Sequence, residues 1–132
     1  MYLKKCVDAY GAILTMMGKE WDYATAYALV TLKHQLMPHA MFFAKEEMKL
    51  AREYAELDEN GNIILTGRGT FRFRDPEKAG EYARKRTELG TVEVRERFIP
   101  VRMKEPERIT PEHLEALEGF VTFGEEEGEK NE

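Results

Sequence analysis

The chain has 132 residues, of which 42% are apolar and 34% charged, which fits one domain with a single core. The apolar share excludes wholesale disorder, and the single cysteine, Cys6, excludes an intramolecular disulfide. Small secreted domains often use several disulfides, so a reducing compartment is expected. No apolar run reaches the roughly 20 residues that span a bilayer, and the first residues lack the apolar region of a signal peptide. These features predict a cytoplasmic protein with no membrane partner.

The net charge of −5 is unevenly distributed along the chain. Residues 1–67 have a net charge of −2, residues 68–104 of +5, and residues 105–132 of −8. A basic middle and an acidic end decide how the surface meets its partners. Residues 124–132 are rich in glutamate and contain no apolar side chain, so we predict one α+β domain over residues 1–123, followed by a disordered acidic tail.

Two helices are predicted at the start of the chain. Apolar residues recur at spacings of three and four over residues 3–17, and Gly18 is placed to end this first helix. The second helix begins at the N-cap residue Asp22 and meets no stop signal before residues 58–61. A straight helix of that span would be about 50 Å long. Pro38 lacks the backbone N–H and predicts a kink or two abutting helices.

The second helix has a wide apolar face. One apolar row repeats every seven residues, and two further rows run beside it. The further rows are Val30, Met37, Ala44 and Ala51, and Met41, Met48 and Ala55. A helix of this length has more apolar surface than one small core can cover, so we predict a homo-oligomer. The residues expected to mediate this self-association are Leu29, Leu36, Phe43 and Leu50.

Residues 60–74 predict a β-hairpin, because an Asn-Gly turn is followed by a short apolar strand, a second turn at residues 66–69 and a strand that alternates in polarity with a period of two. In the alternating segment, Phe71 and Phe73 would be buried and Arg72 and Arg74 exposed.

The remaining segments predict short helices and further strands. Residues 75–77 and 110–112 each combine an N-cap, a proline in the first turn and a glutamate, which is typical of a helix start. Residues 91–99 alternate in polarity and predict a third strand, and residues 120–123 could form a last one. The expected fold class is α+β: an N-terminal helical hairpin with a long second helix, then a small antiparallel sheet with one or two short helices.

The side chains do not show the spacing of a catalytic or metal site. His34 and His39 are five residues apart, so on a helix they point about 140° apart and cannot share a metal ion. The chain has no serine for a serine-type hydrolase. Residues 58–69 fail as a calcium loop, because Ile63 and Gly69 stand where a glycine and a bidentate acid are needed. We therefore predict that the chain is not an enzyme and has no metal or cofactor.

Arginines and phenylalanines alternate in the predicted hairpin, and two interpretations stay open. The simpler one is an amphipathic strand with a basic outer face. In the other, the rings stack on bases and the arginines bind phosphates, as in proteins that bind single-stranded nucleic acids or nucleotides. The candidate binding residues in that case are Arg68, Phe71, Arg72, Phe73, Arg74, Arg95 and Arg97.

Several short motifs follow one another in a definite order, at residues 36, 38–39, 42–43, 49–50, 54, 58–62, 75–78, 91–94, 109–111 and 114–119. In this order they resemble a group of short proteins of bacteriophages and prophages, mostly of Gram-positive bacteria, with no assigned function. The resemblance implies an accessory protein in the host cytoplasm and transfers no catalytic residue. We predict a non-enzymatic binding protein that contacts a host or phage protein and itself. The alternatives are a nucleic-acid or nucleotide-binding protein that uses residues 68–104, and a virion assembly component.

Overall fold

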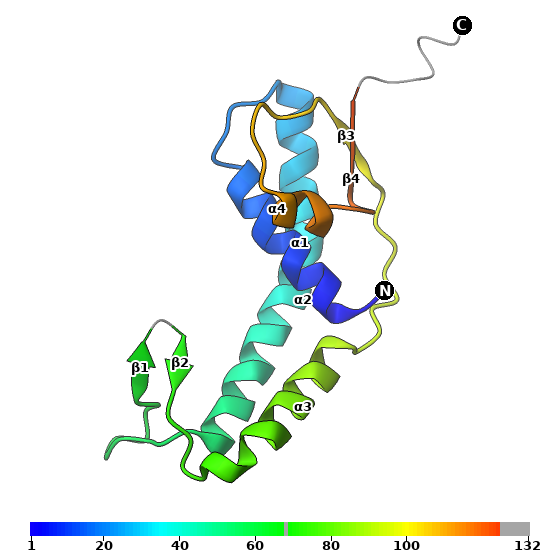
Figure 1. The fold of residues 1–132 in the computed structure, drawn as a ribbon. Coiled ribbons are helices and arrows are strands. Elements are labelled where there is room, and N and C mark those ends of the chain that lie inside the picture. Colours follow the sequence, from blue (N-terminus) through cyan, green and yellow to red (C-terminus); the bar gives the residue numbers. More distant parts are fainter. Residues whose placement is uncertain (68, 125–132) are drawn as a thin grey trace, which may run out of the picture.

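The computed structural model describes residues 1–67 and 69–124, and it shows an α+β fold built along one long helix (Figure 1). The predicted acidic tail, apart from Gly124, lies outside the described residues. The elements in chain order are α1 (Leu3–Met16), α2 (Tyr23–Tyr54), β1 (Leu65–Gly67), β2 (Thr70–Phe71), the 3-10 helix η1 (Pro76–Lys78), α3 (Ala79–Gly90), β3 (Val101–Met103), α4 (Pro111–Ala116) and β4 (Val121–Phe123).

Helices α1 and α2 form the predicted helical hairpin, in which α1 lies along the first half of α2 (Figure 1). The Asp22 carboxylate caps α2 by accepting a hydrogen bond from the backbone N–H of Thr25 at 3.3 Å. Hydrogen bonds from Thr25 also lower the pKa of Asp22, because they favour the charged carboxylate. The predicted start of the long helix is therefore confirmed at the residue that supplies its cap.

Helix α2 continues without interruption through Pro38, so the prediction of two abutting helices is wrong. A proline inside a helix removes one hydrogen bond and costs about 3 kcal/mol. The packing of a buried face supplies most of the stability of a protein helix. Leu36 on one side of the proline and Phe43 on the other are both buried, and this packing holds the helix together across Pro38, which is itself exposed.

The main core lies where α1, the first half of α2, α4, β3 and β4 meet. Phe120, Leu3 and Ile13 are among its largest buried side chains. Strands β3 and β4 pair in parallel, with Val101 opposite Val121, and the crossover between them contains α4. The predicted last strand is confirmed, but its parallel partner was not predicted.

Residues 91–99 do not form the predicted third strand. One isolated bridge joins Glu93 to Tyr2, and no strand is assigned to residues 94–100. The alternation in polarity has a different cause: Val94 is buried in the core, whereas its neighbours are exposed. Strand structure begins only at Val101, because there the chain reaches a partner strand, β4, for its backbone hydrogen bonds.

The second half of α2 packs against α3, and the β-hairpin lies at the end of α2 (Figure 1). Strands β1 and β2 pair antiparallel, as predicted. Isolated bridges between Ala55 and Phe73 and between Leu57 and Ile63 extend this pairing back to the end of α2. The hairpin is therefore a direct continuation of the helix.

The turn that leads into the hairpin confirms the interpretation of residues 58–62 as a turn. The Asp58 carboxylate accepts hydrogen bonds from the backbone N–H groups of Asn60 and Asn62, each at 2.9 Å. Gly61 has a φ of 82°, a conformation that favours glycine. The Asp58 oxygen that could bind a cation is thus used to close the turn.

Candidate functional site

Helix α2 has two apolar faces, and one of them is covered by the same chain. Leu29, Leu36 and Phe43 are buried in the main core, and Leu50 is half-buried. These are the residues predicted to mediate self-association. The three buried ones already pack against the rest of their own chain, so a second copy cannot reach them, and their assignment to an interface is wrong.

The second apolar face of α2 is exposed and follows a heptad spacing along the helix. Intervals of four and three residues alternate over eight positions, and this places all of them on one stripe. Tyr23 is 87% exposed, Tyr27 67% and Met41 63%, while Met37 is half-buried. We call this stripe the outer seam, and it consists of Tyr23, Tyr27, Val30, His34, Met37, Met41, Ala44 and Met48.

The charged residues near the outer seam differ between its two ends. Between residues 23 and 44, α2 contains no acidic side chain. Glu20 and Asp22, both exposed, precede the helix at its N-terminal end. Near the other end of α2, three exposed basic residues each come directly after a position of the heptad pattern. They are Lys45, Lys49 and Arg52. Acidic side chains lie among these cations, and Glu46 forms an ion pair with Lys49 at 3.1 Å, so the end of the outer seam is flanked by both signs of charge.

A groove of about 680 Å³ opens beside the C-terminal part of the outer seam. Ala44 and Met48 from the seam line one wall, and Ile63, Leu65 and Phe71 of the hairpin segment line another. The Leu65 side chain is largely exposed. The apolar surface of the seam thus continues beneath the hairpin.

An aromatic cluster at the base of the hairpin uses both rings that were candidates for base stacking. The rings of Phe71 and Phe73 meet the Tyr82 ring edge-on, with centroids 5.4 and 5.5 Å apart, and Tyr82 meets Tyr54 at 5.7 Å. The Tyr54 hydroxyl donates a hydrogen bond to Glu81, which lowers the pKa of that carboxyl, whereas burial raises the pKa of Tyr82. Phe71 and Phe73 are half-buried and hold the hairpin against α2 and α3.

The arginines of the hairpin are also engaged within the chain. Arg72 is exposed, as predicted, and forms an ion pair with Glu56 at 3.2 Å. Arg74 donates hydrogen bonds to carbonyl groups in the last turn of α2, one of them that of Arg52 at 3.1 Å. These carbonyls have no partner within the helix and attract cations. Arg68 lies outside the described residues.

Arg95 and Arg97 lie in the connection between α3 and β3. Both are exposed, and no ion pair involves either of them within residues 1–67 and 69–124. Between them, the Glu96 carboxylate lies 2.8 Å from the imidazole of His39, midway along α2, and that ring packs edge-on against Phe98. The hairpin lies instead at the end of α2 (Figure 1). The predicted nucleic-acid residues are therefore not brought together in one site.

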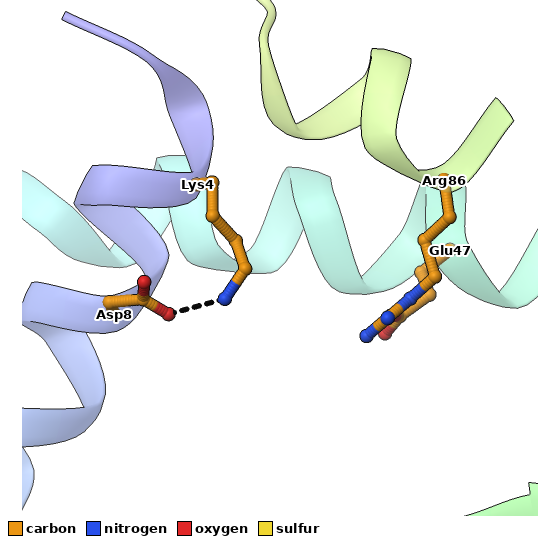
Figure 2. A network of polar contacts seen from close by, with 4 residues as sticks. All are labelled: Lys4, Asp8, Glu47 and Arg86. Carbon is orange, nitrogen blue, oxygen red and sulfur yellow. Dashed lines mark hydrogen bonds and ion pairs between the residues drawn. The ribbon is translucent and has the colours of Figure 1, made fainter. Parts of the chain in front are cut away.

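A second groove, of about 430 Å³, lies where α1, α2 and α3 meet. Phe43 contributes to its lining, and Lys4 and Arg86 lie at its rim. Figure 2 shows an acid beside each of these cations: Asp8 accepts from Lys4 at 2.6 Å, and Glu47 accepts from Arg86 at 2.5 Å. Because both cations are already paired and exposed to solvent, this groove is a weaker candidate for an anion site than its rim suggests.

Within the described part of the chain, no group of three or more histidine, cysteine, aspartate or glutamate side chains could hold a metal ion. No helix there is both long enough and apolar enough to cross a bilayer. The Cys6 thiol is buried, and burial raises its pKa, which disfavours the reactive thiolate. The outer seam is therefore the strongest candidate for a functional surface.

No known protein family, curated protein or solved structure shows significant similarity to this chain. The resemblance to phage and prophage proteins stays a prediction from the ordered motifs. The sequence did contain a signal for the outer seam, in the two apolar rows beside the leucine row. It did not reveal which row the rest of the chain would cover.

Proposed function

We propose that this chain is a non-enzymatic binding protein that acts through protein–protein contacts and associates with itself through the outer seam of α2. The observation that supports this most strongly is a row of exposed tyrosine, valine and methionine side chains at heptad spacing. From Tyr23 to Met48 the row extends over about 38 Å of helix. Heptad spacing is the pattern by which two helices interlock, and tyrosine and methionine are enriched in protein interfaces.

A second copy of the chain suits this surface because it presents the same spacing. Most homo-oligomers are two-fold symmetric, and their interfaces use the same patch on both copies. A long apolar stripe in water is also unusual for a monomer, and a partner helix would cover it. The context of a phage or prophage accessory protein, with a host or phage protein as a further partner, belongs to the same proposal and rests on the ordered motifs alone.

The substitution Met41→Glu tests this proposal. It places a carboxylate in the middle of the outer seam, where a second copy would bury it. Burying an unpaired charge costs well over the approximately 1.4 kcal/mol that corresponds to a tenfold change in affinity. We therefore expect the dimer to dissociate at least about ten times more readily. Light scattering coupled to size-exclusion chromatography over a range of micromolar concentrations measures this change.

Leu14→Glu is the matched control for this experiment. Leu14 is an exposed apolar residue on α1, outside the outer seam, so the substitution makes the same chemical change at a different helix surface. We expect Leu14→Glu to keep the dimer mass of the unsubstituted chain. A clean monomer for the unsubstituted chain at high micromolar concentration would contradict self-association.

Nucleic-acid or nucleotide binding through residues 68–104 is a second proposal with less support. Its support is the exposure of Arg95 and Arg97, whereas the rings of Phe71 and Phe73 already pack in the aromatic cluster. Binding of a labelled single strand that weakens as salt rises would be its signature. A role in virion assembly is compatible with self-association, but it has no residue of its own in support.

A further inference from the structure

We propose that the second copy binds antiparallel to the first, with a two-fold axis that crosses the outer seam between His34 and Met37. This inference rests on the proposed self-association and adds the orientation and register of the two helices. The four pairs of facing positions in this register are Tyr23 with Met48, Tyr27 with Ala44, Val30 with Met41, and His34 with Met37.

Side-chain size favours the antiparallel register. It sets the large ring of Tyr27 against the small side chain of Ala44, so that bulky and small groups interlock. The Tyr23 ring would meet the flexible thioether of Met48, a favourable type of contact. In a parallel pair, the tyrosines of both copies would crowd together at one end, and Ala44 would face Ala44 across a gap. Closely packed interfaces tolerate neither defect well.

The groove beneath the hairpin is a second argument for the same register. Ala44 and Met48 line this groove, so the antiparallel register brings Tyr27 and Tyr23 of the second copy to its mouth. These two rings are the most exposed of the large apolar side chains in the outer seam. The register therefore covers them with the apolar walls of a hollow of about 680 Å³, whereas a parallel pair would set two empty grooves side by side.

The distribution of charge is a third argument. In the antiparallel register, Lys49 comes level with the opposite charge of Asp22 of the second copy. Arg52 comes level with Lys19 of the second copy, so this second pair does not favour the register. A parallel pair would instead set Lys49 level with Lys49 and Asp22 level with Asp22 of the second copy, which is unfavourable. Each exposed ion pair contributes little by itself, so these charges select the orientation more than they strengthen the contact.

Distances between spin labels on the two copies test the orientation. Thr31→Cys and Glu53→Cys each place one attachment site at an exposed position of α2 that is not part of the outer seam. The native Cys6 is buried, so it should resist labelling, and the unsubstituted chain checks this. In the antiparallel register, the two copies of residue 31 lie about 14 Å apart along the helix axis, and those of residue 53 about 52 Å apart. In a parallel pair, both offsets along the axis are close to zero.

Pulsed electron spin resonance on each labelled chain, at a concentration where light scattering shows a dimer, measures these distances. We expect a short distance at residue 31 and a long one at residue 53. Short distances at both positions would overturn the antiparallel register and leave self-association intact. A monomer mass for the unsubstituted chain would overturn the proposed function itself and the register with it, so the two failures are distinguishable.

Discussion

The two apolar faces of α2 lie on one helix, yet they differ in residue type and in surroundings. The inner face, with Leu29, Leu36 and Phe43, is buried in the core of the same chain. The outer seam consists mainly of tyrosine, methionine and valine and is exposed. Methionine adapts its shape to a partner, and the tyrosine hydroxyl remains hydrated when the partner is absent. Periodicity thus identifies apolar faces, while residue type and tertiary contacts tell a core face from a docking face.

The largest expected effect comes from breaking the inner face. Leu36→Ala removes a fully buried side chain, so it should lower the free energy of unfolding by about 2–5 kcal/mol. Met41→Ala, at an exposed position of the outer seam, should lower it by less than about 1 kcal/mol while the chain is monomeric. Urea denaturation at low protein concentration measures both. Equal losses from the two substitutions would show that the outer seam is part of the core.

A smaller effect, with the opposite sign, is expected at Pro38. Because Pro38 is exposed, Pro38→Ala removes no core packing and restores an N–H that can bond to the carbonyl of His34. The free energy of unfolding should rise by about 1–3 kcal/mol in the same urea experiment. A decrease would mean that the contacts of α2 on either side of the proline require a bend at this position.

The smallest expected effect concerns the fit of the outer seam to its second copy. Ala44→Tyr would set two tyrosines against each other in the antiparallel register and weaken the dimer about tenfold. Adding Tyr27→Ala restores one large and one small side chain, so affinity should recover to within about threefold of the original. Sedimentation equilibrium measures both values. If Tyr27→Ala made the Ala44→Tyr dimer still weaker, the two positions would not face each other.

Local signals in the sequence predicted most of the helices and turns. Asp22 and Thr110 cap their helices through their own side chains, and Asp58 closes its turn with hydrogen bonds to nearby backbone groups. Each of these interactions joins residues only a few positions apart. The start of a helix or a tight turn therefore depends little on the rest of the chain.

The candidate site was predictable only in part. The apolar rows of α2 were visible, but the row chosen for self-association is the buried one, because α1 and the segments around β3 and β4 cover it. The hairpin residue Phe71 was correctly placed on a strand, and Arg72 follows directly after that strand. Their partners Tyr82 and Glu56 lie 11 and 16 residues away along the chain, and local pattern did not reveal them.

The sequence by itself determined where the helices begin, where the chain turns and which helix is apolar on more than one side. Tertiary structure alone decided that α2 passes unbroken through Pro38, that residues 94–100 find no strand partner, and that the outer seam stays uncovered. The physical reason is the distance along the chain between the residues that interact. Caps and turns are hydrogen bonds between near neighbours, whereas burial and strand pairing depend on which distant segments reach the same place.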